Sequence, residues 1–304
     1  NEADRKQVKS YDIPSIDLVI VDLYPFEETV AAGGSDAEII EKIDIGGISL
    51  IRGAAKNYKD VLVVGSKNQY GPLLNLLKEK GGESTLDDRR RFAKEAFKVS
   101  SGYDAAIFRY FDGEEGSAWR IGLDKCKPLR YGENPHQQGV FYGDFDALFE
   151  QLHGKEVSYN NLLDIDAAVS LIGDVKETAL AILKHNNACG MACRPNVKEA
   201  WDAALAADPV SAFGGIVITN RTVDRLAAEA INEIFFEVII APGYDKEALD
   251  VLLQKKNRII LIQKPLENAL SHKQYRSALN GALVQDVNDS VQGVGDLKVV
   301  TDRK

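Results

Sequence analysis

Gly215–Ala241, GIVITNRTVDRLAAEAINEIFFEVIIA, is the stretch of sequence that decides the fold. Two short apolar runs, Gly215–Thr219 and Val238–Ala241, enclose Thr222–Phe235, where apolar residues recur with helical spacing. Continuous apolar runs of this length are typical of strands that are covered on both faces. The stretch therefore predicts a strand, a helix and a second strand, and with them an α/β fold built in layers.

The same alternation continues on both sides of this stretch. Other apolar runs predict buried strands at Ile16–Leu23, Asp60–Gly65, Ala179–Leu183 and Arg258–Gln263. Amphipathic segments predict helices at Asn68–Lys80, Asp87–Ser100 and Val197–Ala207. Ser66 suits the N-terminal cap of the first helix, and Gly81-Gly82 suits its end. Phe111–Pro128 interrupts the alternation with glycine, acidic and aromatic residues, so we expect a domain boundary there.

Composition narrows the classes of function. The chain has 304 residues, which corresponds to about two domains. Its net charge of −9 argues against a protein that binds duplex DNA, although a small anionic substrate remains possible. No apolar run approaches the ~20 residues needed to cross a membrane, and the polar first residues do not resemble a signal peptide. Three cysteines favour reduced thiols and a cytoplasmic location. Because the chain lacks an initial Met and Pro265–Lys304 has no closing element, we expect both ends to be cut.

Two motifs in the first third of the chain carry candidate catalytic groups. LYPF follows a predicted strand, and its Tyr24 is a candidate proton donor. In IDIGG and the following RGAAKN, Asp44 and Lys56 are a candidate acid/base pair. The glycine pair between them lets the backbone approach a ligand and can expose N–H donors to an anion. The alternatives are structural, namely an aromatic plug at a strand end and a turn with a surface ion pair.

Three further motifs lie in the rest of the chain. LRYGENPHQ combines Arg130, a candidate phosphate clamp, with Tyr131, a candidate partner for a base. Lys184 and His185 end a predicted strand at a sheet's carboxyl edge, where α/β sites usually lie, and an imidazole suits general-base chemistry. DPVSAFGG joins a helix to a strand. An incidental loop histidine, a strand-end histidine bonded to backbone and an ordinary turn are the respective alternatives.

A metal site at His185, Cys189 and Cys193 is another alternative, because a spacing of four residues would align them on a helix. Gly190 and Pro195 disfavour a regular helix there, and the H-x-E and P-C-x-x-C motifs of zinc deaminases are absent. We therefore expect no zinc. We also expect no reactive thiol at Cys189, because nothing obvious near it would lower its pKa.

Together, these segments resemble the bifunctional purine-biosynthesis family, AICAR transformylase/IMP cyclohydrolase. Eight motifs follow the family's order, from about Ile16 to Lys304: LYPF, IDIGG, RGAAKN, LRYGENPHQ, SYNNLLDIDAA, KHNNACG, DPVSAFGG and IIAPG. The resemblance implies that residues 1–112 are the later part of a cyclohydrolase domain with a methylglyoxal-synthase-like α/β fold. It implies a linker at 113–128. Residues 129–304 would then be the first part of a transformylase domain, built from cytidine-deaminase-like α/β units without zinc.

The resemblance also implies substrates and site residues for the last two steps of de novo purine biosynthesis. For closure of FAICAR to IMP, the matching positions are Tyr24, Asp44, Gly46, Gly47 and Lys56. For formyl transfer from the cosubstrate 10-formyltetrahydrofolate to AICAR, Lys184 and His185 match the catalytic pair. Positions that match the nucleotide pocket are Arg130, Tyr131, Asn161, Phe213, Gly214 and Glu237. The family implies a cytoplasmic homodimer, with no nucleic-acid or membrane partner.

Two positions depart from the family's pattern. Asp22 stands where members commonly carry Asn before LYPF, and an ionised carboxylate cannot donate a hydrogen bond. Ala188 replaces the Pro of Lys-His-x-Asn-Pro. The family's phosphate-gripping Lys-Thr segment and much of its folate pocket are not in this sequence, so we expect little transformylase activity from the chain alone. A noncatalytic nucleotide-binding or dimerisation module, and a deaminase relative that kept its zinc, are the alternatives.

Overall fold

A computed structural model describes residues 2–113, 115–266 and 273–288, and the single positions 295, 298 and 300. It divides into two units, Asn1–Asp124 and Lys125–Lys304, called unit 1 and unit 2 below. The expectation that the chain is cut at its C-terminus falls largely outside the described residues. None of the helices that the structure describes has the length and apolar character to cross a membrane.

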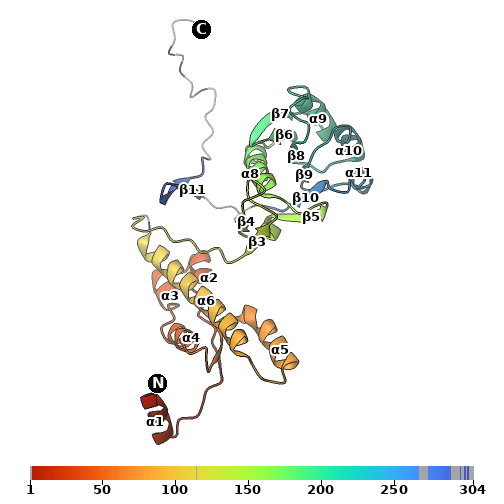
Figure 1. Ribbon diagram of the computed structural model, residues 1–304. Helices are drawn as coiled ribbons and strands as arrows, with labels where there is room; N and C mark the ends of the chain where they lie inside the picture. Colours follow the sequence, from red (N-terminus) through yellow and green to blue (C-terminus); the bar gives the residue numbers. More distant parts are fainter. Residues whose placement is uncertain are drawn as a thin grey trace. The chain divides into compact units, whose positions relative to one another are not determined.

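Unit 1 contains a two-stranded parallel sheet, and Figure 1 labels its helices α1 to α6. Its elements are α1 (Glu2–Ser10), β1 (Leu18–Ile20), α2 (Phe26–Ala31), α3 (Asp36–Ile40), α4 (Gly46–Lys56), β2 (Leu62–Val64), the 3₁₀ turn η1 (Lys67–Gln69), α5 (Tyr70–Glu79) and α6 (Leu86–Asp112). Buried side chains of α4, α6 and β2 form one core, among them Ile51, Val63 and Ala96. The parallel pair places Val19 of β1 opposite Val63 of β2.

The predicted elements of unit 1 are present, with different lengths. As expected, Ser66 accepts a hydrogen bond from the N–H of Asn68, and Gly81 and Gly82 adopt positive φ after α5. The helix predicted at Asp87–Ser100 begins at Leu86 behind a Thr85 capping box and continues to Asp112.

The prediction of a buried strand at Ile16–Leu23 is wrong in its extent and in its burial. Only Leu18–Ile20 forms a strand, and the side chains of Leu18 and Ile20 are 37% and 47% exposed. Val19, on the other face, packs against the core that α4 and α6 share with β2. The strand is therefore covered on one face among the described residues, by the helices that pack on the side of Val19.

Unit 2 is built on a six-stranded mixed sheet. Its elements are β3 (Cys126–Leu129), β4 (Gly139–Tyr142), α7 (Phe145–Leu148), β5 (Phe149–His153), α8 (Tyr159–Gly173), β6 (Ala179–Lys184), β7 (Asn187–Cys193), α9 (Val197–Leu205), β8 (Ile216–Thr219), α10 (Arg225–Ile231), β9 (Val238–Ala241), α11 (Lys246–Leu252), β10 (Ile259–Gln263), β11 (Lys273–Ala278) and β12 (Gly281–Asp286). The central strands follow the order β5-β10-β9-β8-β6-β7, and β3-β4 and β11-β12 form separate pairs. The expected α/β fold is confirmed.

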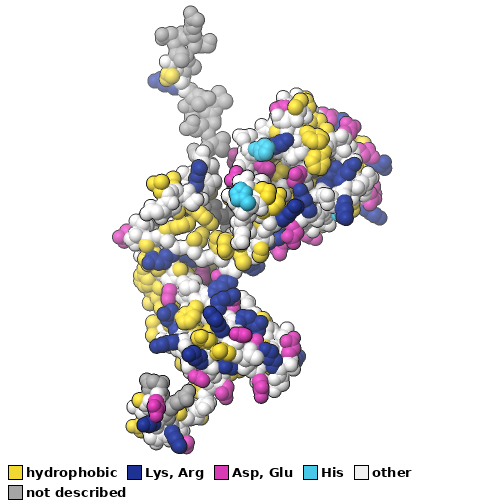
Figure 2. All heavy atoms as spheres, viewed as in Figure 1, with side chains coloured by type: hydrophobic (Ala, Val, Ile, Leu, Met, Phe, Trp, Pro, Cys, Tyr) yellow, Lys and Arg dark blue, Asp and Glu magenta, His cyan; other side chains and the backbone are white. Residues whose placement is uncertain are grey.

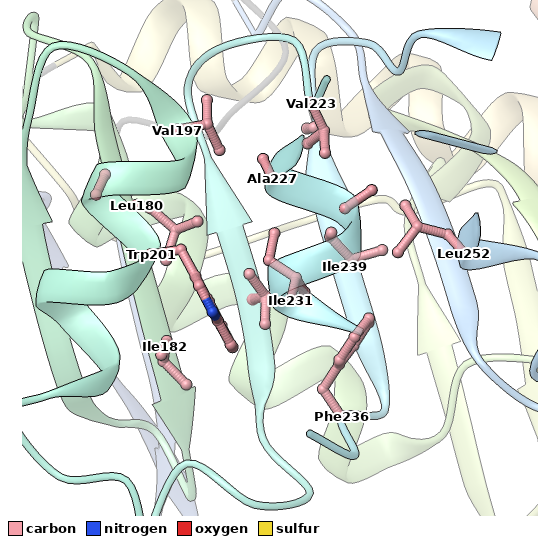
Figure 3. Close-up of a cluster of buried hydrophobic side chains, with 14 of the residues drawn as sticks. Leu180, Ile182, Val197, Trp201, Val223, Ala227, Ile231, Phe236, Ile239 and Leu252 are labelled. Atoms are coloured by element: carbon pink, nitrogen blue, oxygen red, sulfur yellow. The ribbon is translucent and has the colours of Figure 1, made fainter. Parts of the chain in front are cut away.

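Helices cover both faces of the central sheet, which explains the continuous apolar strands. Alternate residues of β6 point to opposite sides. Leu180 and Ile182 join the core beneath α9, α10 and α11, whereas Ala181 and Leu183 join the core beneath α8. Figure 3 shows the first of these cores, with Trp201 of α9 lying beside Leu180 and Ile182.

The stretch Gly215–Ala241 folds as predicted into β8, α10 and β9, with the two strands parallel. The helix is shorter than Thr222–Phe235, because Asp224 caps it by accepting a hydrogen bond from the N–H of Ala227. On the face drawn in Figure 2, acidic and basic side chains are intermixed over both units, as the modest net charge implies.

Candidate functional site

Lys184 and His185 lie where β6 turns into β7. Lys184 pairs with Asn187, so His185 and Asn186 form a two-residue hairpin turn. Both turn residues have positive φ, 52° and 62°, which is the backbone of the tight turns that join antiparallel strands. Positive φ is uncommon for residues other than glycine, although histidine adopts it more often than most. The turn places the titratable side chain of His185 at an exposed edge.

The edge of the sheet on which this turn lies differs from the one predicted. β6 is antiparallel to β8, with Leu183 opposite Ile216, so its last residue lies at the amino end of β8. Since β8, β9 and β10 are parallel to one another, the turn lies at the amino edge of these three strands. The prediction of a carboxyl-edge site is therefore wrong. The apolar runs identify the strands in the sequence, but they do not give the direction of β6.

Two predicted pocket residues, Phe213 and Gly214, precede β8 and lie against Lys184. The Lys184 ammonium donates a hydrogen bond to the carbonyl of Phe213 at 2.8 Å. The N–H of Gly214 donates to the carbonyl of Phe235, and the Phe213 and Phe235 rings have centroids 5.4 Å apart. Both rings are more than half exposed, so they offer aromatic surface beside a cation.

Glu237 and Asn161 form a second polar group on this edge. Glu237 directly precedes β9, and its Oε2 accepts hydrogen bonds from Asn161 Nδ2 at 3.2 Å and from Lys155 Nζ at 3.0 Å. Asn161 is 5% exposed, and its Oδ1 accepts a hydrogen bond from the N–H of Ser158 in the capping box of α8. Asn161 therefore holds Glu237 in place, while Glu237 is the more exposed of the two.

The LRYGENPHQ motif forms the loop between β3 and β4. The Arg130 guanidinium lies 5.3 Å from the centre of the Tyr131 ring. The loop is joined to the start of α8, because Asn160 Nδ2 donates to the carbonyl of Glu133 at 3.3 Å. Asn160 precedes Asn161, so this contact ties the loop to the helix end that holds Glu237.

A small cavity of about 440 Å³ opens beside the turn, lined by Lys184, His185, Asn187, Ala188, Cys189, Asp208 and Ser211. Burial, and then the nearby Asp208 carboxylate, raise the pKa of Cys189, which agrees with the expectation of an unreactive thiol. Cys189 and Cys193 lie in strand β7, so the helix on which a metal site was considered does not form. Within the described part of the chain, no three His, Cys, Asp or Glu side chains are placed to hold a metal ion.

In unit 1, Asp44 lies just before α4 and closes its amino end. Asp44 Oδ1 accepts a hydrogen bond from the N–H of Gly47 at 2.6 Å. The hydroxyl of Tyr103 donates to the carbonyl of Lys42 and accepts from the N–H of Asp44, which is 8% exposed. One of the two glycine N–H groups predicted to meet an anion thus meets the carboxylate of Asp44.

The other predicted residues of unit 1 lie in two places. Tyr24 is 56% exposed and lines a cavity of about 550 Å³ together with Asp22, Ser66, Lys67 and Tyr103. Lys56 is the last residue of α4, whose eleven residues separate the backbones of Lys56 and Asp44 by about 16 Å. Asp44 and Lys56 are therefore not brought together as an acid/base pair in this structure.

Asp22, the position that departs from the family, has a partner within unit 1. The Tyr70 hydroxyl donates to Asp22 Oδ2 at 2.6 Å, and this hydrogen bond raises the pKa of Tyr70. Asp22 Oδ1 is buried with no hydrogen-bond partner among the described residues. Aspartate is thus tolerated at position 22 because the Tyr70 hydroxyl donates a hydrogen bond to its carboxylate.

Sequence reasoning did not select four residues that contact the predicted ones: Tyr103, Lys155, Asp164 and Phe235. The sequence does indicate that Tyr103 is buried, because it follows Ala96 by seven residues on the apolar side of α6. A buried phenol needs a hydrogen-bond partner. Lys155 is a charged loop residue that nothing in the sequence distinguishes from a solvated one. Asp164 lies in the SYNNLLDIDAA motif, but the motif does not show that its carboxylate meets the turn.

Comparisons with known proteins agree with the resemblance. The model of the AICARFT/IMPCHase bienzyme family matches residues 54–304. The chain is 64% identical over 302 residues to a bifunctional purine biosynthesis protein PurH of Bacteroides thetaiotaomicron, covering 99% of this chain and 59% of that protein. Proteins of the same name from Persephonella marina and Bacillus subtilis are 44% and 42% identical, each over 98% of this chain and 60% of the relative.

A solved structure titled "Crystal structure of ForH" is 34% identical and covers 36% of this chain and 58% of its own, with a TM-score of only 0.29. The chain spans about three fifths of the length of the curated relatives it matches. The family match over most of the chain and the identity to these relatives lead to one conclusion: the chain belongs to the AICARFT/IMPCHase bienzyme family.

Proposed function

We propose that this chain takes part in the last two steps of de novo purine biosynthesis. Unit 2 would bind AICAR and transfer to it the formyl group of 10-formyltetrahydrofolate, and unit 1 would close the product, FAICAR, to IMP with loss of water. The observation that carries the proposal is the group of side chains on one sheet edge. There the Lys184 ammonium binds the carbonyl of Phe213, whose exposed ring lies beside that of Phe235, while His185 follows Lys184 and Glu237 precedes β9. The relatives, which are bifunctional purine biosynthesis proteins, support the same pathway.

Formyl transfer needs a base and a cation, because the 5-amino group of AICAR is a weak nucleophile whose lone pair is delocalised into the ring. Its nitrogen bonds to the formyl carbon, the bond from that carbon to the folate nitrogen breaks, the leaving folate nitrogen takes up a proton, and the amine loses a proton. We assign acceptance of this proton to His185. Lys184 keeps two further N–H donors beyond its bond to Phe213, and these can stabilise the oxyanion that forms on the formyl oxygen.

The neighbouring groups suit a nucleotide. The exposed Phe213 and Phe235 rings offer a surface for the imidazole ring of AICAR. Glu237, held by Asn161 and Lys155, can accept hydrogen bonds from amide or hydroxyl groups. Arg130 suits the phosphate, since a guanidinium matches phosphate geometry with two donors.

Ring closure, in our proposal, uses the cavity beside Tyr24. A carboxamide nitrogen attacks the formyl carbon, and the formyl oxygen leaves as water after it gains protons. The Tyr24 hydroxyl is our candidate donor, with Tyr103 lining the same cavity and bonded to the backbone of Asp44. The roles proposed for Gly46, Gly47 and Lys56 rest on the family's motifs alone, and the separation of Lys56 from Asp44 gives that pairing no geometric support.

We also propose the family's arrangement for the whole protein. Residues 1–112 would be the later part of a methylglyoxal-synthase-like domain and 113–128 a linker. Residues 129–304 would be a cytidine-deaminase-like region that works without zinc. The protein would act as a cytoplasmic homodimer, with no nucleic-acid or membrane partner. Because the chain spans about three fifths of its relatives, we further propose that it has little transformylase activity by itself.

Two substitutions and one control test the assignment in a protein of the relatives' full length that carries this chain. His185→Ala should lower the rate of formyl transfer by about 10²- to 10⁴-fold, as loss of a general base does, and leave closure of added FAICAR unchanged. Tyr24→Phe should do the reverse. His153→Ala is the matched control, because His153 lies in β5, the outermost strand on the side of the sheet away from β6.

Rates of FAICAR and IMP formation, measured separately with purified folded variants, check these outcomes. Formyl transfer that survives His185→Ala would remove the proposed base. AICAR binding by calorimetry without transfer in the unaltered full-length protein would support a noncatalytic module instead.

A further inference from the structure

The hairpin turn that carries His185 is held from outside by a residue to which no role has been given. Asp164 lies on α8, and its Oδ1 accepts a hydrogen bond from the N–H of Asn186 at 2.7 Å. We propose that Asp164 is a positioning residue for His185, acting through the backbone of Asn186. This inference rests on the proposed function, in which His185 accepts the proton of the amine.

The backbone of the turn explains why such a contact is needed. A two-residue turn with positive φ at both positions is favourable for Asn or Gly, and unfavourable for a side chain such as that of His185. Strained backbone persists where the surroundings fix it. Within the turn, Asn187 Nδ2 donates to the carbonyl of His185 at 2.7 Å, which fixes one peptide group from the β7 side.

Asp164 fixes the same peptide group from the helix side, because the N–H of Asn186 and the carbonyl of His185 belong to one peptide bond. The acceptor is a carboxylate, which gives the stronger, charge-assisted kind of hydrogen bond to a backbone N–H. α8 packs on β6 and β8, and Ile165, which follows Asp164, lies in the core that it shares with Leu183. The carboxylate therefore belongs to a rigid part of unit 2, whereas the turn is exposed. Through this hydrogen bond α8 fixes where the turn lies, and the turn fixes where the His185 imidazole lies.

The test compares Asp164→Ala with the conservative Asp164→Asn, which keeps an oxygen acceptor. Asp174→Ala is the matched control, because Asp174 follows the other end of the same helix. In the chain itself, the amide exchange of Asn186 measured by NMR should quicken by at least about tenfold in Asp164→Ala only. In the full-length protein, kcat for formyl transfer should fall by roughly 10- to 100-fold in Asp164→Ala, with KM for AICAR within about threefold. Asp164→Asn should keep both the amide exchange of Asn186 and kcat close to the values of the unaltered protein.

The two readouts separate this inference from the function on which it rests. Unchanged Asn186 exchange in Asp164→Ala would show that Asp164 does not hold the turn and would overturn the proposal. Faster exchange with unchanged kcat, in a protein that loses transfer with His185→Ala, would overturn it as well. Full transfer in His185→Ala would instead refute the proposed base, and would leave the Asp164 hydrogen bond as a contact of the fold alone.

Discussion

At the residue scale, the contact between Asp44 and Gly47 shows that a glycine in a functional motif can be required by the fold. A Cβ added to Gly47 would lie 2.5 Å from Asp44 Oδ2, closer than real atoms approach. The carboxylate occupies this space because it accepts the N–H of Gly47 and closes the start of α4. A larger residue at this position must therefore displace the Asp44 carboxylate, whether or not a ligand binds there.

Two glycine substitutions in the same helix should change stability in opposite directions. Gly47→Ala should lower the free energy of unfolding by about 1–3 kcal/mol, because Asp44 must move and its hydrogen bond is lost. Gly53→Ala should raise the free energy of unfolding by up to ~1 kcal/mol, since nothing lies within 4 Å of the added methyl group and alanine favours a helix. Urea unfolding followed by circular dichroism measures both. Equal effects would contradict the crowding at Gly47.

At the element scale, the strands of unit 2 could be predicted, whereas their directions could not. The apolar runs at Gly215–Thr219 and Val238–Ala241 are buried on both faces, and such burial leaves a direct mark on the sequence. The direction of β6 depends on the turn at His185-Asn186, whose residues do not form the Asn-Gly or Asp-Gly pair that usually reveals a hairpin. The sequence therefore indicated Lys184 and His185 as candidates and misplaced the edge on which they lie.

The same distinction explains which site residues could be predicted from the sequence and which could not. Residues within one motif, such as Phe213 and Gly214, could be selected together because the motif is continuous. Lys155 reaches Glu237 across 82 positions, and Asp164 reaches Asn186 across 22, so these contacts exist only after the sheet has formed. For Lys56, spacing suggested a partner in Asp44, but the intervening residues form one helix and hold the two apart.

Tyr244 gives a prediction about strands β9 and β10. Its hydroxyl donates to the carbonyls of Ile239 and Leu261, and burial raises its pKa well above the usual value. A raised pKa means that the neutral phenol stabilises the fold fully below about pH 10, and that this stability is lost as the pH rises further. Tyr244→Phe should cost about 1–3 kcal/mol at pH 8 and flatten the alkaline loss of stability.

Urea unfolding between pH 8 and 11 measures this effect. Tyr142→Phe serves as the control, because Tyr142 is 58% exposed. An alkaline loss of stability that is as steep in Tyr244→Phe as in the unaltered chain would assign that loss to other groups.

At the scale of the whole molecule, the hydrophobic cores respect the division into two units. Three clusters of buried side chains lie within unit 1, two lie within unit 2, and none of these five joins residues of both. Cooperative unfolding follows such shared cores, so the units should unfold as separate transitions.

Two core substitutions test this independence by calorimetry. Ile51→Ala in unit 1 and Ile239→Ala in unit 2 each empty a fully buried site, and each should destabilise its own unit by about 2–5 kcal/mol. We expect each to lower the temperature of one transition and leave the other in place. A single transition that both substitutions shift would show that the two units fold as one.

The alternating side chains of β6 and the short turn that follows it have a consequence for insertions and deletions. Side chains alternate between the two cores along β6, and the turn into β7 contains only His185 and Asn186. Adding or removing one residue in β6 would exchange its two faces, so that Leu183 and Lys184 would trade surroundings. The length of this segment should therefore be far less free to vary among related chains than its composition.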